Sequence, residues 1–446
     1  MTSGAIRMPE YVREALLRLR KAGYEAYPVG GCVRDSLLGN DPYDWDIAAS
    51  ALPDEMKAVF DGCRILETGL KHGTLTVFPR PEAPSVEITA FRVDGDYMDH
   101  RHPERVEFTR SIQEDLARRD FTINAIAQGE DGLIDPFGGV SDLRNGWIRC
   151  VGEPERRFEE DGLRILRGLR FAAVLGFSVE PGTAAAMEKK RKLLHCIAPE
   201  RIFSELKKLL CGKNAPYVLR KHRNVICEIM PELTLMYGFD QHNPFHCYDV
   251  WEHTLHALGN TPPLFSLRMA VLLHDAGKPY TFSQDSNGTG HFYGHTKKSA
   301  ELAETLLSRL RADSAAKERI IFLVARHDLS LLPDEILLKK RLQRFGEENI
   351  RDLFAIQKAD VLALAGPEEK LKELDEAKIV FEKILKERQC FTMKELMITG
   401  EDLKAYMAPG PDMGKLLSWL LNSVIEGVLK NDKDVLLRAA RDWLKK

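Results

Sequence analysis

The sequence has no long apolar segment. Its longest apolar runs, such as MAVLLH around Leu272 and LLSWLL around Leu417, are far shorter than the roughly 20 residues that a membrane-spanning helix needs. The N-terminal segment MTSGAIRMPEYVREALLRLRKAGYEAY carries charge throughout and lacks the apolar core of a signal peptide. We therefore expect a soluble, cytoplasmic protein that does not associate with membranes.

Paired cysteines are also missing. The eight cysteines are scattered and contain no Cys-x-x-Cys pair. This distribution is typical of a cytoplasmic protein whose thiols stay reduced. The cysteines are Cys32, Cys63, Cys150, Cys196, Cys211, Cys227, Cys247 and Cys390.

The chain lacks an excess of positive charge. Its 64 Lys and Arg residues are balanced by 67 Asp and Glu residues, which gives a formal net charge of −3. A uniformly basic surface for nucleic acid is therefore excluded, because phosphate binding draws on concentrated Lys and Arg. One local concentration remains, and it is either an RNA-binding patch or a solvated helix face. Its members are Lys189, Lys190, Arg191, Lys192, Lys207, Lys208, Lys213, Arg220, Lys221 and Arg223.

The periodicity of the chain changes after its first third. Short strand-like and helical segments alternate up to about Asp142, whereas apolar residues recur at helical spacing beyond Pro154. A chain of 446 residues with 44% hydrophobic content is long enough for two to four domains. We expect an α+β fold with a mixed sheet in residues 1–145, followed by helical domains in residues 146–230, 240–345 and 346–446.

A glycine pair marks the first functional motif. An apolar run ending at Val29 predicts a buried strand, Gly30 and Gly31 a tight turn, and residues 33–38 the start of a helix. Such a turn brings backbone N–H groups close to a phosphate, and Arg34 adds a positive charge near the helix N-terminus. This segment predicts an anion-binding turn.

Two carboxylates follow the turn. Asp44 and Asp46 lie one residue apart, and in an extended chain they share one face while Trp45 and Ile47 occupy the other. Oxygen ligands on one face suit Mg²⁺, so the pair predicts a two-metal site for phosphoryl or nucleotidyl transfer. Two solvated acids at a loop end are the alternative, and the glycine turn upstream favours the metal site.

Several segments together resemble one family. They are similar, in order and spacing, to the class II tRNA nucleotidyltransferases, the CCA-adding enzymes, which belong to the DNA polymerase β-like nucleotidyltransferase superfamily. The resemblance covers the first half of the chain and implies a nucleotidyltransferase head in 1–145 and a helical neck in 146–230. The segments are GGCVRDSLLG, DWDIA, GLKHGTLTVF (69–78), VEITAFR (86–92), EDLARRDFTINAIA (114–127) and RFEEDGLRILRGLRF (157–171).

The resemblance implies roles in the head. Asp44 and Asp46 correspond to the catalytic Mg²⁺ ligands, and Gly30, Gly31 and Arg34 to positions at the triphosphate, where a guanidinium binds phosphate oxygens in bidentate fashion.

Glu87 is the candidate third catalytic carboxylate. On the VEITAF strand it could accept the proton of the attacking hydroxyl, and an ion pair with Arg92 is the alternative.

The segment RRDFTINA supplies further nucleotide contacts by resemblance. Arg118 and Arg119 are expected to face the triphosphate, while Asp120 and Asn124 offer an acceptor and a donor for a ribose hydroxyl. An ion-paired helix start is the alternative, and it gives Asn124 no purpose.

Asp161 and Arg164 are three residues apart, a spacing that predicts one helix face. In the family such a pair serves as a protein template for the base of CTP or ATP, because an acid and a guanidinium can match either hydrogen-bonding edge. Arg167 and Arg170 are expected to continue this face as phosphate contacts. Without the family, an ordinary helix salt bridge is the better interpretation of Asp161 and Arg164.

The segment FRVDGDYMDHRHPERVEF resembles the flexible loop that CCA-adding enzymes use when they change from C to A addition. It reads DHRHP at residues 99–103, where many relatives have Gly-Arg-Arg-Pro. The presence of this loop favours A addition. Because its sequence differs from that of many relatives, its role in A addition stays open.

Histidine is concentrated in one section, where eight of the thirteen histidines lie between His242 and His327. Six residues follow the order of an HD-type metal phosphohydrolase, and imidazole with carboxylate suits a divalent ion that activates water. We expect a second divalent metal here, of unassigned identity, in an active or a relic site. The candidate ligands are His253, His274, Asp275, His295, His327 and Asp328.

The last hundred residues, including KELMITGEDLKAYMAPGPDMGKLLSWLL, resemble the body and tail that hold tRNA in the same family. On the residues alone, their apolar stripes are plain helix core. Contact with RNA is implied only by the resemblance.

The motifs together predict template-independent addition of CCA to the 3′ end of tRNA, with CTP, ATP and Mg²⁺. An A-adding or CC-adding enzyme and a poly(A) polymerase are close alternatives. A metal-dependent phosphohydrolase with an RNA-binding head, or a pure RNA-binding protein, are alternatives of another class. The oligomeric state stays open.

Overall fold

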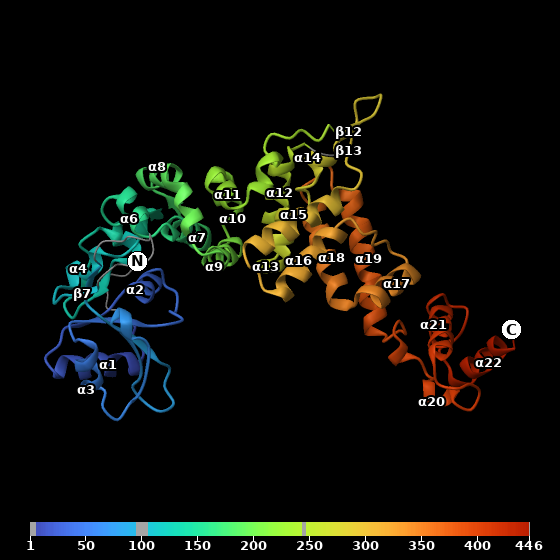
Figure 1. The fold of residues 1–446 in the computed structure, drawn as a ribbon, viewed down its shortest axis with the longest axis horizontal. Coiled ribbons are helices and arrows are strands. Elements are labelled where there is room, and N and C mark those ends of the chain that lie inside the picture. Colours follow the sequence, from blue (N-terminus) through green and yellow to red (C-terminus); the bar gives the residue numbers. More distant parts are fainter. Residues whose placement is uncertain (1–5, 95–105, 243–246, 446) are drawn as a thin grey trace. The chain divides into compact units, whose positions relative to one another are not determined.

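The computed structural model describes residues 6–94, 106–242 and 247–445. The chain forms two compact units (Figure 1). Unit 1 comprises Met1–Pro231 with Arg309–Ala312, and unit 2 comprises Glu232–Ser308 with Asp313–Lys446. The division after Pro231 lies beside the predicted boundary between 230 and 240, whereas the four-domain division stays a prediction.

A five-stranded mixed sheet forms the framework of unit 1, with the order β1-β2-β5-β4-β3. Only β2 and β5 are parallel neighbours, and the other pairs are antiparallel. The apolar residues of β2 and β5 are buried, as the alternation in the sequence predicts. The strands are β1 (Ala26–Pro28), β2 (Asp46–Ala49), β3 (Arg64–Gly69), β4 (Thr74–Phe78) and β5 (Val86–Ala90).

Helix α1 (Glu10–Lys21) shows how sequence spacing sets the packing. Its buried residues Val12, Ala15, Leu16 and Leu19 recur at intervals of three and four and form one apolar face. This face meets β1 and helix α3 (Pro53–Val59). A separate buried cluster includes Val29, Ala48, Phe91 and Leu116. It contains residues next to both the glycine turn and the RRD motif.

Short elements complete the first 150 residues, and β11 at residues 178–179 pairs with one of them. Three two-stranded pairs are formed by β6 with β7, β8 with β9, and β10 with β11. The elements are α2 (Gly31–Leu37), η1 (Leu70–His72), β6 (Arg92–Asp94), β7 (Val106–Phe108), α4 (Ile112–Ala117), η2 (Thr122–Asn124), β8 (Ala127–Gln128), β9 (Leu133–Ile134), α5 (Gly139–Asn145), β10 (Trp147–Ile148) and β11 (Ser178–Val179).

The rest of unit 1 is helical, as the periodicity predicts. Helix α7 packs on α9, which holds the neck segment of the sequence together. The helices are α6 (Pro154–Glu160), α7 (Leu163–Leu175), α8 (Pro181–Lys190), η3 (Arg191–Cys196), α9 (Pro199–Leu210), α10 (Ala215–Lys221) and α11 (Arg223–Ile229).

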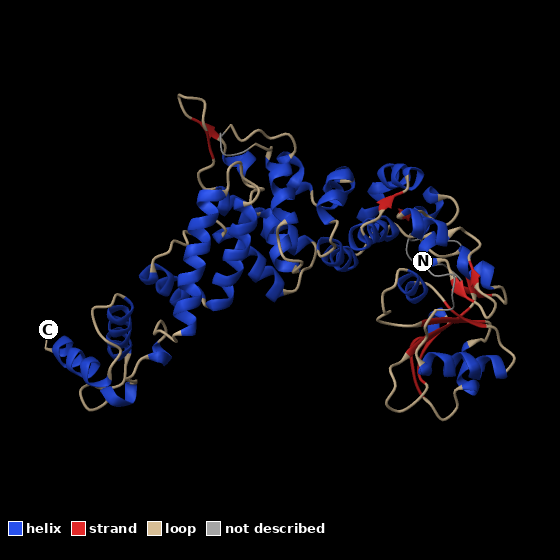
Figure 2. Ribbon diagram, turned by 180° about the vertical axis from the view of Figure 1, so that it is seen from behind, coloured by secondary structure: helices blue, strands red, loops and turns tan. Residues whose placement is uncertain are grey.

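Unit 2 is almost entirely helical (Figure 2). Its described strands are the short pair β12 (Ser283–Gln284) and β13 (Gly290–His291). The helices are η4 (Pro231–Met236), α12 (Val250–Gly259), α13 (Phe265–Leu273), α14 (Lys278–Thr281), α15 (His295–Arg309), α16 (Ser314–Arg326), α17 (Glu335–Phe345), α18 (Glu347–Val361) and α19 (Glu368–Lys386), then η5 (Met393–Glu395), α20 (Gly400–Leu403), α21 (Pro411–Ile425) and α22 (Lys433–Leu444).

The C-terminal helices of unit 2 surround their own apolar cluster, which includes Ile398, Leu416, Leu420 and Leu436. The mixed sheet followed by helices confirms the predicted α+β fold. Among the described helices, none combines the length and the apolar character that crossing a membrane demands.

Candidate functional site

A cavity of about 670 Å³ opens in unit 1. Every residue of the first half that the sequence predicted for metal or nucleotide binding lines it, except Glu87. The lining residues are Gly30, Gly31, Arg34, Asp44, Asp46, His72, Arg92, Arg118, Arg119, Asp120, Asn124, Asp161, Arg164, Arg167, Arg170, Phe171 and Arg201.

The glycine turn forms as predicted. Gly30 has a φ of 76°, in the left-handed region that a side chain would strain. A Cβ atom at this position would also lie 2.8 Å from Arg119 Nη1. Gly30 therefore lets the chain enter α2 while the guanidinium of Arg119 lies directly against the backbone.

The carboxylate pair lies where the turn and the sheet meet the cavity. Asp46 is the first residue of β2, and its neighbours Trp45 and Ile47 are buried on the other face. Burial raises the pKa of Asp46 to about 6, and the like charges of Asp44 and Glu87 add to the rise. Carboxylates that crowd one another in this way fit a divalent cation, because the cation relieves their repulsion.

Glu87 lies beside this pair but outside the cavity lining. It is exposed on β5 and pairs in register with Asp46 on the neighbouring parallel strand. Its catalytic role stays a prediction.

Arg118 and Arg119 share a buried partner. Arg118 Nη2 lies 2.8 Å and Arg119 Nη2 3.1 Å from the carboxylate of Asp115. Despite burial, the two guanidiniums hold the pKa of Asp115 below its usual value. The ion pairing of the alternative is present, since Arg119 pairs with Asp115 and Asp120 with Arg167. The expected helix start is not, because α4 ends at Ala117 and the two arginines follow it.

A chain of hydrogen bonds connects Asp120 to Arg34. Arg167 Nη2 lies 2.6 Å from Asp120 Oδ2, Asn124 donates to Asp120 Oδ1 at 3.0 Å, and Arg34 donates to Asn124 Oδ1 at 2.8 Å. Burial alone would raise the pKa of Asp120, yet Arg167 and Asn124 hold it well below its usual range. Asn124 thus has a structural purpose that the sequence did not suggest.

The structure corrects the predicted helix face of Asp161 and Arg164. Asp161 lies outside the helix, because α6 ends at Glu160 and α7 begins at Leu163. Asp161 Oδ1 accepts from the backbone N–H of Leu163 at 3.0 Å, whereas Arg164 donates to Glu160 at 2.7 Å. The break at Gly162 interrupts the helical spacing from which one face was predicted, although both side chains line the cavity.

Arg201 was missed by the sequence analysis. It lies in the first turn of α9, and its Nη2 atom is 3.0 Å from Asp161 Oδ2. Its Nη1 atom is buried without a hydrogen-bond partner among the described residues. The residue lies forty positions after Asp161, so only the packing of α9 on α7 brings the two side chains together.

Phe171 was also missed, because its spacing in α7 is that of an ordinary core residue. Its ring lies 4.0 Å from the guanidinium carbon of Arg170, 5.1 Å from that of Arg34 and 5.6 Å from that of Arg167. Arginines over an aromatic face are stabilised and held in place. His72 and Arg92 also line the cavity. No pattern in the sequence pointed to His72, and Arg92 was expected only as an alternative ion-pair partner of Glu87.

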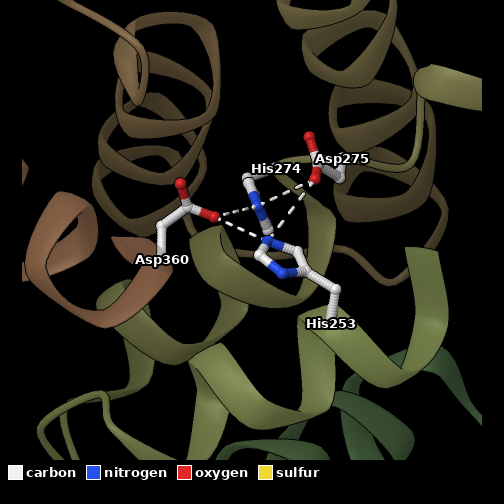
Figure 3. A group of neighbouring side chains, drawn as sticks. All are labelled: His253, His274, Asp275 and Asp360. Atoms are coloured by element: carbon white, nitrogen blue, oxygen red, sulfur yellow. Dashed lines mark hydrogen bonds and ion pairs between the residues drawn. The ribbon is translucent and has the colours of Figure 1, made fainter. Parts of the chain in front are cut away.

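A second group of polar side chains lies inside unit 2. His253, His274, Asp275 and Asp360 place one potential ligand atom each within 4.8 Å of one another (Figure 3). Asp360 Oδ1 lies 2.8 Å from His253 Nε2 and 3.2 Å from His274 Nε2. His274 Nε2 is also 3.2 Å from Asp275 Oδ2. These side chains come from α12, α18 and the end of α13.

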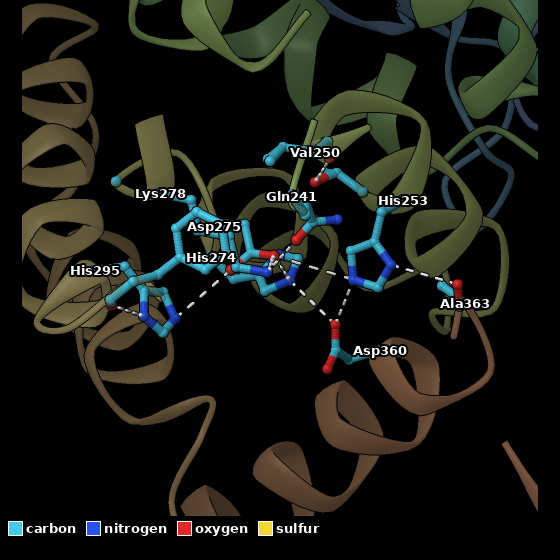
Figure 4. Close-up of polar contacts among 12 residues, drawn as sticks. Gln241, Val250, His253, His274, Asp275, Lys278, His295, Asp360 and Ala363 are labelled. Carbon is cyan, nitrogen blue, oxygen red and sulfur yellow. Dashed lines mark hydrogen bonds and ion pairs between the residues drawn. The ribbon is translucent and has the colours of Figure 1, made fainter. Parts of the chain in front are cut away.

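Three residues form a second group around the same aspartate. Asp275, His295 and His327 also place ligand atoms within 4.8 Å of one another. Asp275 Oδ1 is 3.6 Å from His295 Nε2 (Figure 4). The same oxygen is 3.9 Å from His327 Nε2. We call the six residues of both groups the histidine centre: His253, His274, Asp275, His295, His327 and Asp360.

The predicted sixth ligand differs from the observed neighbour. Asp328 is exposed and lines the cavity beside the histidine centre, but neither group contains it. Asp360 occupies that place, on a helix 32 positions further along the chain. Asp328 was predicted as a ligand because it follows His327 directly. Asp360 has no neighbouring histidine in the sequence, so the same pattern could not predict it.

Opposite charges in the histidine centre stabilise the charged forms of His274 and Asp275. Burial opposes a charge on His274, but the carboxylates of Asp275 and Asp360 raise its pKa to about 10. Lys278 Nζ lies 2.7 Å from Asp275 Oδ2, and Lys278 and His274 hold the pKa of Asp275 well below its usual value. The donor set of imidazoles and carboxylates fits a borderline divalent ion.

The loop expected to assist A addition, at residues 99–103, lies outside the described residues. The same is true of His246.

Comparison with known proteins first defines a class. Residues 26–149 match the Poly A polymerase head domain, residues 176–234 match a "Probable RNA and SrmB- binding site of polymerase A", and residues 291–440 match tRNA nucleotidyltransferase domain 2. The chain is thus a nucleotidyltransferase with a polymerase-type head. Curated relatives match over almost its whole length, and the chain belongs to the family of CCA-adding enzymes.

Two relatives and one solved structure illustrate the match. The CCA-adding enzyme of Limosilactobacillus fermentum is 35% identical and aligns with 98% of this chain and 97% of its own. That of Streptococcus mutans is 36% identical, with 97% and 98% covered. The Bacillus stearothermophilus CCA-adding enzyme in complex with CTP has a TM-score of 0.71 at 29% identity, covering 98% of this chain and 100% of that one.

Proposed function

We propose that this chain adds CCA to the 3′ end of tRNA, with CTP and ATP as substrates. One observation carries the proposal: a single cavity brings the Asp44–Asp46 pair together with six arginines of the predicted nucleotide site and with Asp161. Family membership and the tRNA nucleotidyltransferase match over residues 291–440 support it.

The cavity residues divide the work of nucleotidyl transfer. Arg34, Arg118 and Arg119 bind the triphosphate, because guanidiniums match phosphate oxygens. The tRNA 3′-oxygen bonds to the α-phosphorus, the bond to the β-phosphate oxygen breaks, and pyrophosphate leaves. Glu87 accepts the proton of the attacking hydroxyl. Asp44 and Asp46 would hold Mg²⁺, which would supply positive charge at the attacking hydroxyl and at the leaving pyrophosphate.

Asp161 and Arg164 select the base. A carboxylate acceptor and a guanidinium donor can face the Watson–Crick edge of cytosine or adenine. Arg201 holds Asp161 through one guanidinium nitrogen, which leaves the other Asp161 oxygen to the Leu163 N–H. Asp161 is therefore oriented before a nucleotide enters, and pre-orientation lowers the cost of binding. Arg167 and Arg170 contact phosphate, and Asp120 with Asn124 contacts the ribose.

Incorporation of labelled nucleotides tests the proposal. Three tRNA substrates, ending before CCA, after one C and after CC, are incubated with CTP, ATP or both. Extension of each substrate that stops at CCA is the expected result. Addition of only A or only C identifies a partial enzyme, and unlimited A tails identify a poly(A) polymerase.

A second candidate function rests on the histidine centre, which we propose binds a divalent metal and serves phosphate ester hydrolysis. Its support is the convergence of imidazole and carboxylate atoms on Asp275. If hydrolysis were the principal activity, Asp44→Ala would leave it intact and His274→Ala would abolish it. An RNA-binding protein without catalysis would be unaffected by either change and would need no metal.

We also propose the finer organisation of the molecule. Residues 1–145, 146–230, 240–345 and 346–446 act as head, neck, histidine section and tRNA-binding body, and the protein works in the cytoplasm. Limited proteolysis checks the organisation, because cleavage would concentrate near residues 145, 235 and 345.

A further inference from the structure

A buried carboxylate lies behind two adjacent arginines of the cavity in unit 1. Asp115 is part of α4, its side chain is 0% exposed, and it is not among the residues that line the cavity. Its Oδ1 atom accepts from Nε and Nη2 of Arg118 at 3.0 and 2.8 Å, and its Oδ2 atom accepts from Nη2 of Arg119 at 3.1 Å. From this geometry we propose that Asp115 is a positioning residue, which holds both guanidiniums as one clamp for the triphosphate of the incoming nucleotide.

The packing of α4 does not require a charge at position 115. The neighbouring residues Ile112 and Leu116 belong to a buried apolar cluster, so an apolar side chain would suit the same environment. A buried carboxylate is costly unless it is paired. The two guanidiniums offset this cost, and the pairing that results fixes the position of both.

Two adjacent guanidiniums need such a partner before they can act together. Like charges repel one another, and each arginine side chain has several rotatable bonds that must be ordered when it binds. Asp115 attracts both charges and takes one guanidinium on each oxygen. Both side chains are thereby ordered before a nucleotide enters, and ordering in advance lowers the cost of binding.

Arg119 is also held from the side of the glycine turn. Its Nη1 atom lies 2.8 Å from the place that a Cβ atom would take at Gly30 and 3.5 Å from the backbone oxygen of Asn124. Val29, the residue before Gly30, donates its backbone N–H to the backbone oxygen of Asp46 at 3.0 Å. The clamp is therefore fixed against the turn that is bonded to the strand of Asp46.

Both arginines remain open to the cavity. The side chains of Arg118 and Arg119 are 16% and 18% exposed, and both residues line it. Charge-assisted hydrogen bonds from such guanidiniums are the strong contacts to phosphate oxygens. The role of the clamp in the reaction rests on the proposed addition of CCA, whereas the clamp itself is tested by binding alone.

Binding and kinetics of the full chain test the proposal. Asp115→Asn keeps the size of the side chain, removes its charge and leaves one oxygen to accept. Equilibrium dialysis with labelled CTP, without divalent metal, measures affinity, and inorganic tripolyphosphate is the competitor that lacks a base. We expect both affinities to fall by about 10-fold, as when a charge-assisted hydrogen bond is lost. The KM values for CTP and ATP should rise equally, while KM for tRNA should stay unchanged.

Glu114→Gln is the matched control. Glu114 is the exposed neighbour of Asp115 on α4 and undergoes the same change from acid to amide, so affinity and KM should stay as in wild type. The binding measurement also separates the two proposals. A wild-type chain that binds CTP through the clamp but adds no CCA would contradict the proposed function and leave the clamp intact.

A double-mutant cycle distinguishes positioning from a purely structural role. In the chain carrying Arg118→Met and Arg119→Met, adding Asp115→Asn should cause no further loss of CTP affinity, because Asp115 acts through the two arginines. If Asp115→Asn alone does not fold, Asp115→Asn with Arg118→Met removes one charge of each sign. Its CTP affinity should lie about 5-fold below that of Arg118→Met alone, because Arg119 is released.

Two results would overturn the proposal. One is an Asp115→Asn chain that keeps the wild-type affinities for CTP and tripolyphosphate. The other is an equal loss of affinity on adding Asp115→Asn with and without the two arginines, which would assign Asp115 to the stability of α4 alone.

Discussion

The cavity of unit 1 and the histidine centre of unit 2 present their carboxylates in opposite ways. In the cavity, Asp44 is exposed, and burial together with the like charges of Asp44 and Glu87 raises the pKa of Asp46 to about 6. In the centre, Asp275 is surrounded by imidazoles and Lys278, and its pKa falls well below its usual value. We therefore expect a cation to relieve the repulsion at Asp46, whereas Asp275 already lies among imidazoles and Lys278.

The residues around the carboxylates also differ between the cavity and the histidine centre. Arginines dominate the lining of the cavity, which suits a large polyanion such as a nucleoside triphosphate. Histidines dominate the centre, which suits ions that imidazole binds tightly. The difference shows that two candidate metal sites in one chain can be distinguished by what surrounds the carboxylate.

The largest expected effect comes from Asp46→Asn. Loss of one carboxylate weakens the charge stabilisation of the transferring phosphate, so nucleotide incorporation should fall by about 10³-fold. Metal content of the histidine centre should stay unchanged. Incorporation that survives in Asp46→Asn but is lost in His274→Ala would reverse the assignment of the two sites.

Base selection gives the next largest effect. Asp161→Ala should lower the preference for CTP and ATP over UTP and GTP by about 10²-fold, as expected when a hydrogen-bond acceptor of the base site is lost. Arg201→Met should lower it less, by about 10-fold, because Asp161 remains but is no longer held. The ratios of kcat/KM for the four nucleotides measure both. An unchanged ratio in Asp161→Ala would exclude Asp161 from base selection.

Phe171→Leu should weaken binding of the triphosphate. The smaller side chain leaves Arg34, Arg167 and Arg170 without their shared aromatic face, so KM for CTP should rise by about 5-fold while kcat changes little. Val174→Leu is a matched control, since Val174 is exposed on the same helix. A fall in kcat with constant KM would assign Phe171 to the chemical step instead.

A buried histidine in unit 1 should make the stability of the protein depend on pH. In unit 1, burial lowers the pKa of His222 to about 4, so the unfolded chain binds its proton more readily. Stability should therefore fall as the pH falls from about 6.5 toward about 4, by about 1 kcal/mol between about pH 7 and about pH 5.5. Urea unfolding of wild type and His222→Gln at both pH values measures it, and equal pH dependence in the two would contradict the assignment.

Much of the cavity could be predicted because its residues lie in compact sequence motifs. The turn at Gly30 and Gly31 and the pair Asp44 and Asp46 are local patterns, and local geometry decides where they point. Asp161 and Arg164 were predicted to line one helix face, and this was wrong because α6 ends at Glu160. Periodicity does not reveal a short interruption when helical spacing continues on both sides of it.

Local sequence patterns predicted the α+β fold, the family, the carboxylate pair and the concentration of histidines, because each depends on residues close together in the chain. The folded structure added that Arg201 holds Asp161, that Phe171 lies against Arg34, and that Asp360 rather than Asp328 joins the histidines. Those contacts join residues distant in sequence, and packing such as that of α9 on α7 and of α18 on α12 and α13 creates them. No spacing along the chain encodes that packing.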